Sequence, residues 1–217
     1  LLDKAKQKGT GKWTSQDAMN LGVPIPTIDA AVSMRALSSL KADRVAADKA
    51  YNLNDNIPIS TDKQAMVKMV EGALHVAFIT AYAQGMHMLY EASKEYGYGT
   101  DLEAVARIWR GGCIIRASLL EDIRKAYDAE PNLQNLLQSD VFVQKVVADY
   151  PAIKEFIELA ANKGLPSMAF GASFNYLGAF ITDRLPLNVV QAQRDYFGSH
   201  TYERTDREGI FHTEWER

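Results

Sequence analysis

The chain has 217 residues, enough to bury one large hydrophobic core or to form a substantial part of a bigger protein. Hydrophobic residues make up 47% and charged residues 24%, which is ordinary for a soluble globular protein. The formal net charge of −3 excludes the basic surface of a nucleic-acid binder, so an anion site would need locally gathered cations. No apolar run approaches the ~20 residues of a membrane span, and no signal peptide is visible. We therefore expect neither nucleic acid nor a membrane as a partner.

Cysteine occurs once, at Cys113, which excludes a disulfide within the chain and favours a reducing cytoplasm. Its small and aliphatic neighbours predict a buried side chain rather than a nucleophile. The chain opens at Leu1 inside a polar stretch typical of a helix end, and we expect it to be a fragment of a longer polypeptide.

Helical periodicity runs through the chain and no segment alternates as a strand would, so we predict an all-α fold. Proline, glycine and small polar residues mark where the helices begin and end. The predicted helices cover about residues 14–22, 27–51 (capped by Thr27 and bent near Ser38), 61–96, 100–109, 114–128, a short turn after Pro131, a segment capped by Ser139, 151–163, 167–183 and 187–197.

The longest predicted helix, about residues 61 to 96, is expected to be the centre of a multi-helix bundle. It far exceeds the usual length of about 11–12 residues, and its alanine-rich interior suits close packing on several sides. After His200 the chain is charged and aromatic without helical pattern, which predicts an extended tail docked on another surface. We therefore divide the chain into a helical domain, residues 1–200, and a tail, residues 201–217.

The segment Lys8-Gly9-Thr10-Gly11-Lys12-Trp13-Thr14 has the composition of an anion-binding loop. Its glycines can turn backbone N–H groups toward an anion, its lysines add charge, and Thr10 adds a hydroxyl. It is not a Walker A loop, because Lys6 and Trp13 stand at positions that this motif reserves for glycine and Ser or Thr. It is not a Rossmann fingerprint either, because no strand precedes it. From composition alone, a simple turn of the chain is the commoner explanation.

The same segment, with Asp3 upstream, resembles the signature of the 6-phosphogluconate dehydrogenase family, with Lys6 in place of a small residue. Other stretches resemble this family in the same order along the chain, which makes the resemblance far more specific than one motif. They are Leu21-Gly22-Val23-Pro24-Ile25-Pro26-Thr27 with Arg35-Ala36-Leu37-Ser38-Ser39-Leu40, Ile108-Trp109-Arg110-Gly111-Gly112-Cys113-Ile114-Ile115-Arg116, and Gln191-Ala192-Gln193-Arg194-Asp195-Tyr196-Phe197-Gly198-Ser199-His200-Thr201-Tyr202-Glu203.

The resemblance implies the C-terminal helical domain of a cytoplasmic homodimer, with a tail that threads into the partner subunit. The parent enzyme would oxidise 6-phosphogluconate with NADP in the pentose phosphate pathway and decarboxylate the intermediate to ribulose 5-phosphate and CO2. The family's general base and acid, and its NADP-binding Rossmann domain, lie upstream of these residues. We therefore expect no catalytic residue here, NADP bound mainly by the missing domain, and no activity from this segment alone.

The resemblance also assigns five residues to the substrate. Lys8, Thr10 and Arg35 would bind it in one subunit, with the planar Arg35 guanidinium meeting two phosphate oxygens at once. Arg194 and His200 would reach the same substrate from the partner subunit. From the residues alone, Arg35 could instead pair with a carboxylate, Arg194 could face a helix dipole, and His200 could be a surface residue.

The remaining candidates are interpreted as structural. His75 and His87 lie twelve residues apart without a third ligand, so no metal site is predicted. Three arginines are expected to hold carboxylates or helix ends, and two tryptophans to lie in the core: Arg107, Arg110 and Arg116, and Trp13 and Trp109. Two other functions stay open, a purely structural dimerisation module and a related β-hydroxyacid dehydrogenase acting on an unphosphorylated acid.

Overall fold

The computed structural model describes residues 1–53 and 62–215 of the chain. Residues 52–60, which separate the predicted helices 27–51 and 61–96, therefore lie almost entirely outside the described residues. Within them the chain forms two compact units, the first from Leu1 to Leu177 and the second from Gly178 onward. The division at residue 200 that the sequence suggested stays a prediction.

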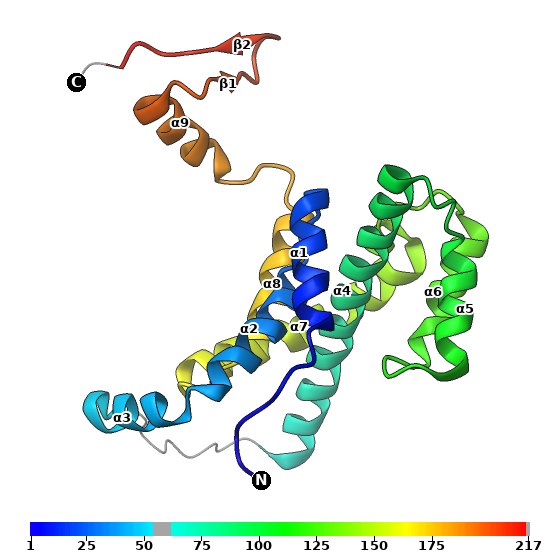
Figure 1. Ribbon diagram of the computed structural model, residues 1–217, viewed down its shortest axis with the longest axis vertical. Coiled ribbons are helices and arrows are strands. Elements are labelled where there is room, and N and C mark those ends of the chain that lie inside the picture. The colour runs from blue at the N-terminus through cyan, green and yellow to red at the C-terminus, as the bar shows by residue number, and fades with distance from the viewer. Residues whose placement is uncertain (54–61, 216–217) are drawn as a thin grey trace. The chain divides into compact units, whose positions relative to one another are not determined.

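Helices make up almost all the regular structure of the described residues, which confirms the predicted all-α fold (Figure 1). The elements of the first unit are α1 (Thr10–Leu21), α2 (Pro26–Ser39), α3 (Lys41–Tyr51), α4 (Lys63–Tyr96), α5 (Leu102–Gly112), α6 (Leu119–Ala129), the 3-10 helix η1 (Leu136–Gln138), α7 (Asp140–Asn162) and α8 (Met168–Phe180), which runs on into the second unit. The second unit adds α9 (Leu187–Gly198), β1 (Tyr202–Glu203) and β2 (Ile210–Phe211).

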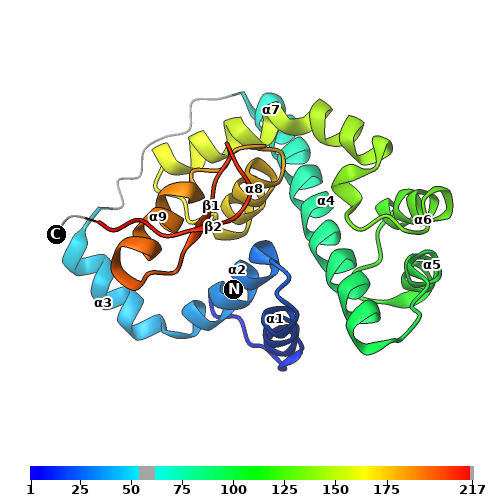
Figure 2. The ribbon, with the colours of Figure 1, turned by 90° about the horizontal axis from the view of Figure 1, so that it is seen from above.

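The long helix α4 is the centre of the first unit, as predicted. Asp62 caps its start by accepting hydrogen bonds from two first-turn N–H groups, and Gly97 ends it in the left-handed conformation. Helices α1, α2, α5 and α7 pack against it (Figure 2). The 3-10 helix η1 also contacts α4. The fully buried side chains of α4, including Ile79 and Met86, join those of α6 and α7 in the main core. Length and composition would let α4 cross a membrane, but its packing identifies it as the core helix of this unit.

Helices α4 and α7 approach each other closely at Gly72. A Cβ atom there would lie 2.7 Å from the Cβ of Ala152 and 3.3 Å from Oδ1 of Asp149, so only glycine fits. Pro151, which we expected to begin a new helix, lies inside the continuous α7. Proline removes one helical hydrogen bond, and the packing of α7 along α4 compensates for this loss.

The predicted bend near Ser38 is a complete break, with α2 ending at Ser39 and α3 starting at Lys41. The hydroxyl of Ser38 donates to the carbonyl of Arg35, and that of Ser39 donates to the carbonyl of Ala36. Such local hydrogen bonds compete with the helical ladder, and here they coincide with its interruption at Leu40.

Two other helix starts differ from those predicted. Helix α5 begins at Leu102 rather than at residue 100, and Asp101 caps it, because its carboxylate accepts from the N–H of Ala104 at 3.1 Å. Helix α6 begins at Leu119 instead of residue 114. The aliphatic run that predicted the earlier start leaves Ile114 fully exposed, so no burial stabilises a helix there.

The tail of the second unit contains a small hairpin that the sequence did not predict. Strands β1 and β2 pair antiparallel, with Tyr202 opposite Phe211 and Glu203 opposite Ile210. The guanidinium of Arg207 lies over the Phe211 ring at 4.6 Å from its centroid. Strands of two residues are too short to show alternation, which explains why the periodicity missed them.

Candidate anion-binding site

Helix α1 begins at Thr10, inside the glycine-lysine segment, which corrects both the predicted loop and the predicted helix start at Thr14. Gly9 is the N-cap residue, with a φ of 105° that strains any residue with a Cβ. No side chain of the described residues caps this end, and the first turn of α1 contains no acid. The free N–H groups of the first turn therefore carry the positive end of the helix dipole, which attracts anions.

The side chain of Arg35, on α2, lies against this first turn of α1. A Cβ on Gly11 would fall 2.7 Å from Nη2 of Arg35 and 2.8 Å from Cγ2 of Val32. The missing side chain of Gly11 is what lets the guanidinium approach the backbone next to Thr10. Two residues that the resemblance assigned to the substrate, Thr10 and Arg35, are thus neighbours in the fold.

Lys8 is held near the same place by the path of the N-terminal segment. On one side of it, the N–H of Ala5 donates to Oγ of Ser38, one turn beyond Arg35 on α2. On the other side, Gly11 contacts Arg35 itself. Three residues span at most about 11 Å, so the backbone of Lys8 stays close to this part of α2.

The cations of this group have no acidic partner within ion-pair distance in the part of the chain that the structure describes. Arg35 therefore does not pair with a carboxylate among the described residues, as one alternative had suggested. Asp3, the acid closest to Lys8 in sequence, binds Lys41 at 2.8 Å and Arg44 at 2.9 Å. These two cations lower the pKa of Asp3 to about 2. Arg35 and Lys8 thus keep their charge available for an external anion.

A buried hydrogen-bond network fixes the start of α2 and so helps to position Arg35. The N–H of Thr27 donates to Oε1 of Gln84 at 3.0 Å, and Nε2 of Gln84 donates back to Oγ1 of Thr27 at 2.9 Å. That hydroxyl also lies 3.0 Å from Oγ of Ser173. The network joins α2 to α4 and α8. Thr27 was predicted to cap its helix, but the cap position belongs to Ile25 and Thr27 lies inside α2.

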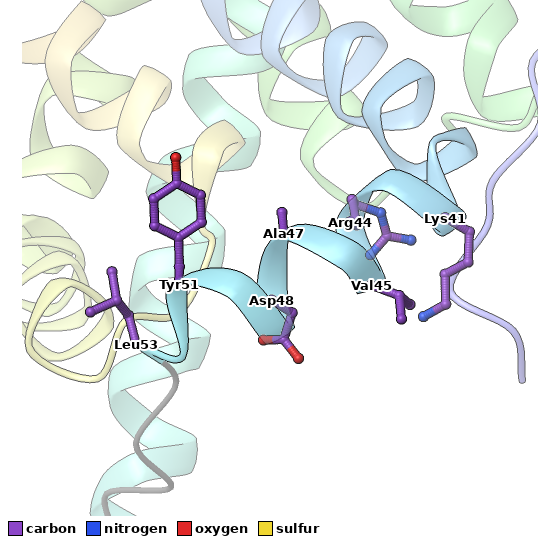
Figure 3. A pocket seen from close by; sticks show the side chains of 7 residues that line it. All are labelled: Lys41, Arg44, Val45, Ala47, Asp48, Tyr51 and Leu53. Atoms are coloured by element: carbon purple, nitrogen blue, oxygen red, sulfur yellow. The ribbon is translucent and has the colours of Figure 1, made fainter.

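The hollows on the described residues include one beside Arg35 and one along α3. One of about 280 Å³ adjoins Arg35 and is otherwise lined mainly by apolar groups of α2, α4 and α8. A larger one of about 470 Å³ follows α3 (Figure 3) and is lined by Lys41, Arg44, Val45, Ala47, Asp48, Tyr51 and Leu53. Both cations of this larger hollow already bind Asp3, so it is not the anion site.

The other two predicted site residues, Arg194 and His200, lie in the second unit. Arg194 is exposed on α9 and donates to Oε1 of Gln191 at 3.3 Å, with no acidic partner among the described residues. His200 follows the end of α9, and its exposed ring packs on Gly198, where a Cβ would lie 2.8 Å from it. The Phe197 ring meets the imidazole edge-on at 6.1 Å.

Sequence reasoning missed the buried carboxylate between these two residues. Asp195 is fully buried and accepts four hydrogen bonds, from the N–H groups of Thr201 and Thr213, from Nε1 of Trp215 and from Nδ1 of His212. Burial raises the pKa of Asp195, but these hydrogen bonds outweigh it and hold the pKa well below its usual range. The signal in the sequence is an acid in the last turn of a helix, where it opposes the helix dipole.

Several residues outside these groups are structural, as predicted. Arg107 pairs with Glu103 at 3.8 Å, Arg110 pairs with Glu121, and Trp109 packs against the main core. His75 lies 2.6 Å from Asp149 of α7.

Two predictions for residues outside the site were wrong. Trp13 is 62% exposed rather than buried, because its ring covers Gly9 on the surface of α1. Cys113 is exposed after the end of α5, and its thiol donates to the carbonyl of Trp109. Among the described residues, no group of three His, Cys, Asp or Glu side chains is placed to hold a metal ion.

The structure thus makes Thr10 and Arg35 neighbours in the first unit, with Lys8 on the segment that leads into α1, and it places Arg194 and His200 in the second unit. That both groups meet on one substrate stays a prediction. Fold and site together define an all-helical domain with unpaired cations at a helix N-terminus, a domain class suited to binding an anionic ligand. Over residues 1–215 the chain matches the family described as 6-phosphogluconate dehydrogenase, C-terminal domain, and it belongs to that family.

Individual relatives agree with this assignment. The chain is 51% identical over 215 residues to the decarboxylating 6-phosphogluconate dehydrogenase of Synechococcus elongatus and 46% identical to the NADP(+)-dependent enzyme of Bacillus subtilis. Each alignment covers 99% of this chain and 46% of the relative. The solved 6-phosphogluconate dehydrogenase of Plasmodium falciparum matches with a TM-score of 0.94 and 42% identity, over 99% of this chain and 46% of that one. The chain therefore spans a little under half the length of these relatives.

Proposed function

We propose that this chain is the C-terminal, substrate-binding part of an NADP-dependent enzyme that oxidatively decarboxylates 6-phosphogluconate to ribulose 5-phosphate and CO2. One observation carries the proposal. The unpaired Arg35 guanidinium lies against the uncapped N-terminus of α1, in a chain whose relatives act on a phosphorylated sugar acid.

The phosphate of the substrate would bind between α1 and α2. The planar guanidinium of Arg35 can donate to two phosphate oxygens at once, while the first-turn N–H groups of α1 and the Thr10 hydroxyl donate to others. Lys8 adds a point charge from the segment before the helix. Each charge-assisted hydrogen bond contributes about 1.5–3 kcal/mol, so this group can hold the substrate by its phosphate and thereby orient its reacting end.

Arg194 and His200 would complete the pocket from a second copy of the chain. Both are exposed, and no acid pairs with Arg194 among the described residues. The unit that carries them also exposes large apolar side chains, among them Val189, Phe197 and Ile210, which are between 64% and 75% exposed. Such a surface is typical of a segment covered in an assembly. We therefore propose a homodimer with shared sites, in which the tail docks on the partner.

NADP would be held mainly outside this chain. Dinucleotides bind to the crevice of a parallel sheet, and the only strands in the described residues are the two of a short antiparallel hairpin. The cofactor site therefore belongs to the part of the relatives that this chain does not span. The residues described here bind and orient the substrate, and this segment alone is proposed to be inactive. We place the enzyme in the cytoplasm.

Kinetics of the full-length enzyme test the proposal. Arg35→Ala and Arg194→Ala should each lower kcat/KM for 6-phosphogluconate roughly 30- to 1,000-fold, which corresponds to a loss of about 2–4 kcal/mol of transition-state stabilisation. Arg107→Ala, which breaks only an exposed pair with Glu103, is the matched control and should leave kcat/KM within about twofold of wild type. Wild-type kinetics for both site variants would contradict the phosphate assignment. If the site variants then only failed to form dimers, the structural dimerisation module would be favoured. If the wild-type enzyme used gluconate as well as 6-phosphogluconate, the related β-hydroxyacid dehydrogenase would be favoured.

A further inference from the structure

We propose that Asp195 is a positioning residue, which fixes the turn that carries His200 and the end of α9 that carries Arg194. The roles of Arg194 and His200 rest on the proposed function. The action of Asp195 on the tail does not, and it can be tested separately.

The contacts of Asp195 account for its complete burial. Its Oδ1 accepts from the N–H of Thr201 at 2.9 Å and from Nδ1 of His212 at 2.8 Å. Its Oδ2 accepts from the N–H of Thr213 and from Nε1 of Trp215, both at 3.0 Å. Each oxygen of the carboxylate thus has two donors, which is its full capacity. Asp195 therefore joins α9 to the turn after it and to the chain that returns from the hairpin.

Asp195 also holds the backbone on both sides of His200. Its carbonyl accepts from the N–H of Ser199 at 2.9 Å, and its carboxylate accepts from the N–H of Thr201. The carbonyl of Thr201 in turn accepts from Nε2 of Gln191, at 2.5 Å. His200 is thus bracketed by residues that are both tied to α9.

The backbone of this turn needs such ties because it is strained. Ser199 has a φ of 50° and Thr201 a φ of 61°, both in the left-handed region that non-glycine residues rarely adopt. A β-branched residue such as Thr201 is especially unfavourable there. Conformations of this kind persist only when the surroundings impose them, and they concentrate at functional sites. The imposed turn holds the His200 ring against Gly198 and leaves it exposed, six residues beyond Arg194 in the sequence.

Asp195→Asn is the sharpest perturbation, because it keeps the shape and removes half of the acceptors. The amide group has one acceptor oxygen, so its NH2 must face two of the four donors. At least one half-buried backbone N–H group, of Thr201 or Thr213, then loses its partner. Asp206→Asn is the matched control, since Asp206 lies in the same tail but is exposed, and its ion pair among the described residues is with Arg204.

Amide hydrogen exchange on the 217-residue chain measures the protection that the Asp195 carboxylate gives to the N–H groups of Thr201 and Thr213. In Asp195→Asn the amides of Thr201 and Thr213 should exchange about tenfold faster or more, while Asp206→Asn leaves them as in wild type. Unchanged exchange in Asp195→Asn would overturn the proposal. Should Asp195→Asn unfold the tail, Trp215→Phe removes one donor and keeps the carboxylate. The Thr213 amide should then exchange a few-fold faster, and wild-type exchange would overturn the proposal.

Steady-state kinetics of the full-length enzyme test whether the fixed turn contributes to substrate binding. Asp195→Asn should raise KM for 6-phosphogluconate about tenfold and leave KM for NADP unchanged, because the side chain acts through Arg194 and His200. Faster exchange with an unchanged KM for 6-phosphogluconate would overturn the positioning role. If Arg194→Ala itself had wild-type kinetics, the proposed function of Arg194 would fail, and the exchange data would still decide whether Asp195 holds the turn.

Discussion

The contact between α4 and α7 at Gly72 gives a quantitative prediction for Gly72→Ala. The added methyl group would lie 2.7 Å from Cβ of Ala152, whereas carbon atoms in contact are about 3.5–4.0 Å apart. Because the Cβ of Ala152 is fixed to the backbone, no change of rotamer can relieve the overlap. The two helices would have to separate by roughly 1 Å at this point.

The expected loss of stability is the difference between two opposed effects. Overpacking of a well-packed core costs about 1–3 kcal/mol. Replacing a glycine inside a helix by alanine stabilises it by about 0.5–1 kcal/mol. The rigid partner favours the upper part of the overpacking range, so Gly72→Ala should lower the free energy of unfolding by about 1–2 kcal/mol.

Gly85→Ala is the matched control, since Gly85 also lies in α4 and a Cβ there meets nothing within 4 Å. It should raise the free energy of unfolding by about 0.5–1 kcal/mol. Because the helix-propensity gain is common to both variants, the difference between them isolates the packing cost. Urea denaturation followed by circular dichroism measures both. A Gly72→Ala variant as stable as Gly85→Ala would refute the close approach of the two helices.

Gly11→Ala would displace the Arg35 guanidinium from the first turn of α1, so KM for 6-phosphogluconate in the full-length enzyme should rise about tenfold. Steady-state kinetics check this, and an unchanged KM would show that the substrate does not depend on this placement of Arg35. Asp3 should titrate at about pH 2, because Lys41 and Arg44 stabilise its charged form. The stabilisation from the ion pairs of Asp3 with Lys41 and Arg44 is fully present above the ordinary pKa of 3.8 and is lost as the pH falls through about 2. Carboxyl-carbon NMR measures this midpoint, and a midpoint near 3.8 would contradict the tie.

The helical frame could be predicted from the sequence where local signals agree with packing. Helix α4 carries a continuous apolar pattern bounded by Asp62 and Gly97, and both ends are close to their predicted positions. The start of α1 was missed because Gly9 and Gly11 disfavour a helix locally. Contact with α2 overrides that preference, since Gly11 is needed at the crossing. The predicted helix start at Pro151 was wrong for the same reason, because tertiary packing stabilises a helix that local propensity alone would interrupt.

The candidate site shows a similar limit. Lys8, Thr10 and Arg35 were identified by resemblance to a family, since no spacing rule brings α1 and α2 together at Gly11. Asp195 was missed, because a polar residue on an amphipathic helix reads as part of the solvent face, and its place in the last turn of the helix does not tell what covers it. Only the returning chain, with its donors at positions 212, 213 and 215, gives this carboxylate a buried environment.

If one substrate site draws cations from two subunits, mixed dimers of two inactive variants should regain activity. Full-length Lys8→Ala and Arg194→Ala are expected to be nearly inactive on their own. In a mixed dimer, one of the two sites would combine an intact Lys8 with an intact Arg194. Dissociating and reassociating an equal mixture should therefore restore roughly a quarter of wild-type activity. Mixed dimers that form but recover no activity would contradict the claim.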